Sequence, residues 1–160
     1  MRLVELSTAE QGYLSRPLPP VDTWTPLLTA RLCGVLGARM KQRVQMVTVT
    51  CDPLNNTEHA EPEISWDSAL DALWIHARLG GSARITQPCA ALSRNLRHTL
   101  QQALAETWVS SAQHPSLPRA LHLRIECTSK TGEVAQAALT IYFPASLGQM
   151  DRWAQRLITT

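Results

Sequence analysis

The stretch WIHARLGGSARITQPCAAL, residues 74–92, decides the fold that the sequence predicts. Apolar and polar side chains alternate from Ile75 to Leu79, which is the two-residue period of a half-buried strand. Gly80 and Gly81 can adopt the positive φ values of a two-residue turn, and the alternation resumes over residues 83–85. Since a proline follows soon after, we predict a β-hairpin that ends before Pro88.

A helix is predicted directly after this proline. Apolar side chains recur there at steps of three and four residues, through Leu92, Leu96, Leu100, Ala103, Leu104 and Trp108. This spacing is typical of an amphipathic helix of about five turns. The first predicted unit is therefore hairpin, proline, helix.

The same order of elements is predicted in the C-terminal quarter, LHLRIECTSKTGEVAQAALTIYFPASLGQMDRWAQRLI. Residues 121–125 and 139–143 alternate as two strands around a turn at 129–132, Pro144 follows, and helical spacing runs over 147–158. Two units in one order indicate an internally duplicated chain of α/β (α+β) class, a pseudo-two-fold sandwich of hairpins and helices.

The N-terminal half begins with a lead-in and then adds a helix and a strand. Residues 1–21 end in RPLPP, which favours an extended backbone. Thr25 and Pro26 suit a helix N-cap and first helical position, and the apolar stripe after them ends at Met40. Residues 44–51, rich in Val and Thr, predict a strand, and residues 52–63 predict a polar loop.

Composition limits the chain to one domain and excludes several functions. At 160 residues, 44% hydrophobic and 18% charged, it suffices for one good core, so we predict a single domain over 22–160. The net charge is +2, and no block of basic residues predicts nucleic-acid binding. The N-terminus does not resemble a signal peptide, and no stretch reaches the length of a membrane span. We therefore expect a cytoplasmic protein.

No motif in the sequence predicts catalysis. The four cysteines lie far apart, the five histidines show no metal-ligand spacing, and no phosphate-binding glycine loop or nucleophile elbow occurs. The acidic cluster at residues 58–63 falls in the predicted polar loop, where nothing indicates a carboxyl group with a shifted pKa. We expect no enzyme activity, no metal, no cofactor and no small-molecule substrate.

Four segments in order resemble one family. They are LLTARLCGVLGARMKQRVQMVTV, LWIHARLGGSARITQP, LRHTLQQALAETW and LHLRIECTSKTGEVAQAALTIYFPASLGQM, and together with the final helix they cover residues 27 to about 158. This series is similar to the middle domain of the flagellar motor-switch protein FliM and to the amino-terminal domain of SctQ, the C-ring protein of type III secretion. The resemblance implies an internally duplicated α/β sandwich that is also found in CheC-type phosphatases.

The resemblance also suggests which residues bind a partner and which do not catalyse. In the flagellar protein a glycine-rich loop contacts a neighbouring rotor protein, and the matching residues here are Gly80, Gly81 and Ser82, with Arg84 close by. In the related phosphatases an acidic residue three positions before an asparagine orients water. Here Asn95 is present but Leu92 occupies the acidic position, so that reaction lacks its carboxylate.

The expected function is thus that of a non-catalytic scaffold in the cytosolic C-ring, or sorting platform, of a type III secretion system. Its partners would be other secretion or basal-body proteins at the cytosolic face of a membrane complex. The family's β-rich ring-forming module does not follow residue 160, so we expect a split subunit or a fragment that needs that module as a partner. One alternative is a flagellar motor-switch domain that binds rotor proteins. The other is a CheC-type phosphatase, which Leu92 at the acidic position argues against.

Overall fold

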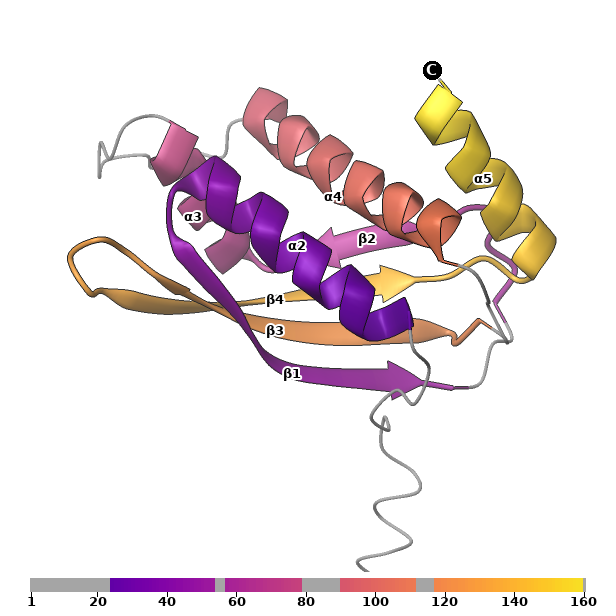
Figure 1. Cartoon of the computed structure of the whole chain (residues 1–160), viewed down its shortest axis with the longest axis horizontal. Coiled ribbons are helices and arrows are strands. Elements are labelled where there is room, and N and C mark those ends of the chain that lie inside the picture. The colour runs from indigo at the N-terminus through magenta and orange to yellow at the C-terminus, as the bar shows by residue number, and fades with distance from the viewer. Residues whose placement is uncertain (1–23, 54–56, 79–89, 112–116, 160) are drawn as a thin grey trace, which may run out of the picture.

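The computed structural model describes residues 24–53, 57–78, 90–111 and 117–159. Four helices and four strands lie within these ranges (Figure 1). In chain order they are α2 (Trp24–Met40), β1 (Arg43–Asp52), β2 (Glu63–Trp66), α3 (Ser68–Arg78), α4 (Ala90–Ser110), β3 (Ala120–Thr128), β4 (Val134–Tyr142) and α5 (Leu147–Thr159). The chain is thus of mixed α/β class, as the sequence predicts.

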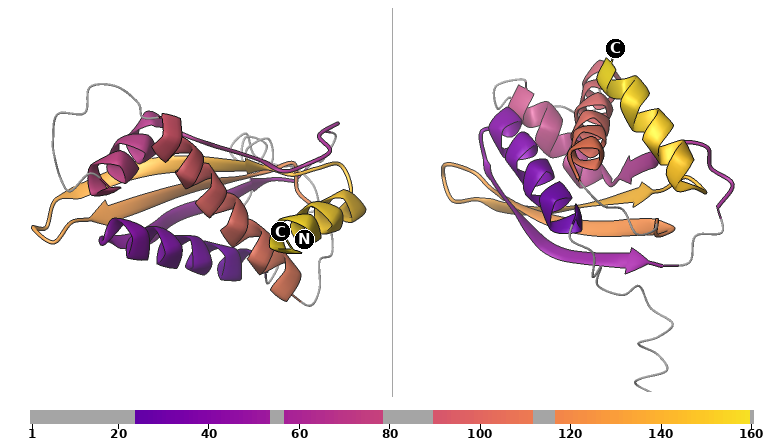
Figure 2. Two further views of the ribbon diagram at one scale, coloured as in Figure 1. Left: turned by 90° about the horizontal axis from the view of Figure 1, so that it is seen from above. Right: turned by 45° about the vertical axis from the view of Figure 1, so that its right-hand side comes forward.

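The strands form one antiparallel sheet in the order β1-β3-β4-β2. All four helices lie on the same face of this sheet, and Figure 2 shows that arrangement from two further directions. Along β3 the side chains that face the helices are buried, while those between them are partly or fully exposed. The described part of the molecule therefore has two layers, helices on one side of the sheet and an open sheet face on the other.

The core lies between the helices and the sheet, and aromatic rings occupy its centre. Trp24 at the start of α2 meets Trp108 of α4 edge-on, with ring centroids 5.4 Å apart, and meets Phe143 edge-on at 5.8 Å. Edge-to-face contacts add about 0.5–1.5 kcal/mol each to the burial of the rings. These contacts join the beginning of the described chain to its third and fourth quarters.

Several sequence predictions are confirmed. The helix that starts near Thr25 is α2, the Val- and Thr-rich strand is β1, and the helix expected after Pro88 is α4. The C-terminal unit is also as predicted, with β3 and β4 paired over their full lengths and α5 after Pro144. Gly132 in the turn between β3 and β4 has a φ of 89°, a backbone conformation that glycine adopts readily.

The prediction of a first hairpin is wrong over residues 74–78. Those residues form the second half of α3, in which Leu70 and Trp74 are fully buried at a spacing of four. The strand interpretation would have placed Trp74 on the solvent side. The helix is more stable than the strand because it buries Trp74, the largest side chain of the segment. Burial of a large apolar side chain contributes about 1.5–3 kcal/mol. The predicted turn and return strand, residues 79–87, lie outside the described residues.

The predicted polar loop is shorter than expected, because β2 begins at Glu63. The described elements run helix, strand, strand, helix twice along the chain. However, β3 and β4 are neighbours, whereas β1 and β2 lie at opposite edges of the sheet. The first unit therefore lacks the strand pairing of the second, and the argument for duplication from two matching hairpins does not hold.

Candidate protein-binding surfaces

Polar side chains that could take part in chemistry instead tie elements together, and Asp67 illustrates this. It lies between β2 and α3, where its Oδ1 accepts a hydrogen bond from the Leu70 amide at 3.1 Å and caps the helix. Its Oδ2 accepts from the Ala138 amide of β4, also at 3.1 Å, and its own amide donates to the Ala138 carbonyl. One carboxylate thus joins a helix start to a strand.

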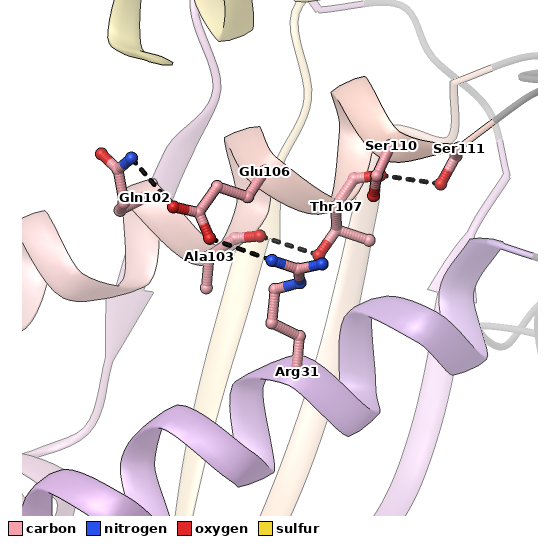
Figure 3. A network of polar contacts seen from close by, with 7 residues as sticks. All are labelled: Arg31, Gln102, Ala103, Glu106, Thr107, Ser110 and Ser111. Atoms are coloured by element: carbon pink, nitrogen blue, oxygen red, sulfur yellow. Dashed lines mark hydrogen bonds and ion pairs between the residues drawn. The ribbon is translucent and has the colours of Figure 1, made fainter. Parts of the chain in front are cut away.

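A second tie joins α2 to α4 (Figure 3). The Arg31 guanidinium donates to Glu106 Oε2 at 2.9 Å, and Gln102 donates to the other carboxylate oxygen at 3.1 Å. The Arg31 and Glu106 side chains are 38% and 43% exposed, so water screens the pair and its contribution to stability is small. Gln102 and Glu106 both belong to α4, so Arg31 provides the link between the two helices.

Two further carboxylates serve the same purpose. The buried indole of Trp108 donates from its Nε1 to Asp151 Oδ1 at 2.7 Å, which ties α4 to α5. Ser93 donates to Asp71 Oδ1 at 3.0 Å and ties α4 to α3. Each of these acids accepts a hydrogen bond from another element, so the carboxylates hold neighbouring helices together.

Arg97 of α4 contacts the short strand β2. Its guanidinium donates to the Ile64 carbonyl of β2 at 2.7 Å and stacks over the Trp66 ring at 4.6 Å from the ring centre. Arg94 is exposed on α4, and Arg84 lies outside the described residues. Arg97 therefore anchors α4 to the short edge strand β2.

A shallow cleft of about 200 Å³ opens between α5 and the segment before β2. It is lined by Ala60, Glu61, Gln149, Arg152, Trp153 and Arg156. Arg156 is ion-paired with Glu61, and Gln149 accepts hydrogen bonds from Ser146. With most of its polar groups already engaged, the cleft has no arrangement of side chains that indicates catalysis.

The described helices leave the other face of the sheet uncovered (Figure 1). Register places one row of side chains across three strands there, with Thr50 opposite His122 and His122 opposite Thr140. The next row across β3 and β4 contains the exposed Arg124 opposite Ala138. This face carries both signs of charge, with Arg124 and Glu126 both on β3, and exposed side chains of this kind are common in protein interfaces.

Strand β1 forms one edge of the sheet along its full length, and it contains a β-bulge. The pairing with β3 shifts between Met46 and Thr48, so Val47 has no partner and is 44% exposed. On both sides of the bulge the helix-facing side chains of β1 are only partly buried. The apolar side chains on the helix side of β1 are therefore only partly shielded from water.

Cys33 and Cys127 are free thiols in partly and fully buried positions. Burial raises the pKa of Cys33 and of Cys127 above the ordinary thiol value, and their mutual repulsion adds to the rise for Cys127. Both thiols are therefore poor nucleophiles near neutral pH. Within the described ranges, no group of three or more potential metal ligands comes together.

The partner-binding residues predicted from sequence, Gly80, Gly81, Ser82 and Arg84, all lie outside the described residues. The edge and open face were missed because strand order depends on pairing between distant segments. One signal was present: apolar residues at 44, 46, 47 and 49 change phase at Val47, and such a phase change is typical of a bulge.

Among the described helices, none is both long and apolar enough to cross a membrane.

Comparisons with family models, with curated proteins and with solved structures found no significant match.

Proposed function

We propose that this chain is a non-catalytic scaffold subunit of the cytosolic C-ring, or sorting platform, of a type III secretion system. The observation that carries the proposal is the one-sided frame: helices joined by side-chain ties cover one face of the sheet, and none of the described elements covers the other face. A scaffold needs rigidity and a broad surface for partners, and both features are found here.

The use of the carboxylates supports a non-catalytic role. Asp67, Glu106 and Asp151 each hold two elements together, which is a structural use of these carboxylates. Leu92, at the position where the related phosphatases carry an acid, packs against the core. We therefore place the CheC-type phosphatase last among the alternatives.

The assignment to secretion is supported by the four sequence segments that resemble SctQ and FliM. The repeated order of helix, strand, strand, helix is what a duplicated domain requires of its element order. We therefore include the pseudo-two-fold sandwich in the proposal on the basis of this element order. β1 and β2 differ from a duplicated hairpin because they do not pair with each other. A location at the cytosolic face of the secretion apparatus belongs to the same proposal.

Co-purification tests this function. The tagged chain, expressed in its own cell and cross-linked, should bring down ring, stalk and ATPase-regulator proteins of a secretion system. Arg124→Glu on the open face should reduce their recovery, whereas Arg94→Glu on the exposed side of α4 should not. Recovery of flagellar rotor proteins, together with binding of a phosphorylated response regulator, would establish the flagellar alternative. Recovery of neither set would refute both.

A further inference from the structure

We propose that two copies of this chain associate through their β1 strands, antiparallel, so that two four-stranded sheets become one continuous sheet. An edge strand carries backbone N–H and C=O groups on its outer side that a second strand can pair. β1 provides such an edge over ten residues, the longest strand of the sheet. The inference does not depend on the assignment to a secretion system.

The apolar layer under the helices indicates that the edge is incomplete. On the neighbouring strand β3, the helix-facing side chains Leu121, Leu123, Ile125 and Cys127 are 0–2% exposed. Their partners on β1 are Cys51, Val49, Met46 and Val44, and all four are only partly buried. A further strand about 4.8 Å away would place a second apolar row beside them and complete the layer.

The bulge decides which strand fits. Residues paired across an antiparallel sheet point to the same face, and side chains alternate between faces along a regular strand. Because Val47 is the extra residue, Arg43 and Gln45 before it share the open face with Thr48, Thr50 and Asp52 after it. Two β1 strands related by a two-fold axis between residues 47 and 48 therefore match face to face along their whole length.

The side chains in that register complement each other. On the open face Arg43 lies opposite the partner's Asp52, and Gln45 lies opposite the partner's Thr50. On the helix side Val44 lies opposite the partner's Cys51, and Met46 lies opposite the partner's Val49. A shift of the register by one residue would place apolar side chains of one copy against polar side chains of the other.

The charges at the two ends favour this arrangement as well. The symmetry creates the Arg43–Asp52 pairing twice, once at each end of the joined strands. Asp52 keeps a loose contact with Arg119 of its own chain at 3.5 Å, and its side chain is 32% exposed, so it can accept a second guanidinium. Since the axis is perpendicular to the sheet, both helical layers lie on one side and the two open faces form one surface.

Mass measurement in solution tests the association. Sedimentation equilibrium of the full chain should give twice 17.7 kDa at high concentration. Val47→Glu places two carboxylates at the axis and should weaken the dimer by at least about tenfold. Val134→Glu is the matched control, because this valine of β4 is 58% exposed and does not lie on the β1 edge. It should leave the dimer unchanged. A monomeric wild type, or a Val47→Glu dimer of unchanged strength, would overturn the proposal.

Engineered disulfides test the register and do not depend on the stability of the charged variant. Gln45→Cys combined with Thr50→Cys should give a covalent dimer on oxidation, because opposite Cβ atoms lie about 4.5–5.5 Å apart. The two positions are about 16 Å apart along one strand, too far for a bond within a copy. Gln45→Cys with Thr48→Cys corresponds to a shifted register and is the control, with the parent protein as the blank for native thiols. Equal cross-linking of the two pairs would refute the register.

Discussion

Replacement of Asp67 by alanine tests whether the side-chain ties hold the frame together. The change removes the cap of α3, which costs about 1 kcal/mol for a typical N-cap. It also removes the acceptor for the Ala138 amide of β4, and a hydrogen bond of this kind contributes about 1 kcal/mol. The Ala138 amide is close to solvent, and water can partly replace the lost acceptor. We therefore expect the free energy of unfolding to fall by about 2 kcal/mol in total.

Urea denaturation followed by circular dichroism measures this loss, and the melting temperature should fall by about 4–8 °C for a chain of this size. Asp67→Asn keeps one oxygen for the cap, so its loss should be about half as large. Glu133→Ala is the control, since that exposed carboxylate makes no hydrogen bond or ion pair with another described residue. If Asp67→Ala were no less stable than Glu133→Ala, the tie would not exist and the account of the frame would be wrong.

Four further substitutions probe other parts of the frame. Asp151→Ala removes the acceptor of the buried Trp108 indole and should lower the free energy of unfolding by about 1–3 kcal/mol in urea titrations. Gly34→Ala should raise the melting temperature, because a Cβ there meets open space, whereas Gly37→Ala should lower it, because its Cβ would lie 2.9 Å from the Gln42 carbonyl oxygen. Burial raises the pKa of Cys127, so its thiol binds a proton more tightly in the folded state. The resulting contribution to the free energy of unfolding is complete below the ordinary thiol pKa and is lost as pH rises through the raised pKa. Urea midpoints measured from neutral pH to well above the ordinary thiol pKa should fall less steeply in Cys127→Val than in the parent protein.

The contrast between α3 and the β3–β4 hairpin shows where sequence-based prediction succeeds. In the hairpin, two alternating strands are joined by a short turn, so pairing needs contacts only between neighbouring segments. Residues 74–78 also alternate, but Leu70 and Trp74 lie one helical turn apart, and a core has to be in place before burial of that indole can favour the helix. Asp67 followed by a helix-compatible segment was the local signal for the N-terminus of α3.

The candidate surfaces were less accessible to prediction than the elements that carry them. The sequence predicts a turn at the glycine pair, residues 80–81, because turn formation depends on only a few neighbouring residues. Strand β1 was identified correctly as a strand, but its position at the edge follows from pairing with β3, more than sixty residues later in the chain. Val47 becomes an exposed residue at a bulge only once that register is known.

The amino-acid sequence by itself determined the mixed α/β class, the positions of α2, β1, α4, β3, β4 and α5, and the turn at Gly132, because periodicity and turn chemistry act over a few residues. Only the tertiary structure decided that residues 68–78 are helical, that β1 and β2 lie at opposite edges, and that the described helices all cover the same sheet face. These features depend on which distant side chains share a core, and the free energy of that burial exceeds the small local preference between helix and strand.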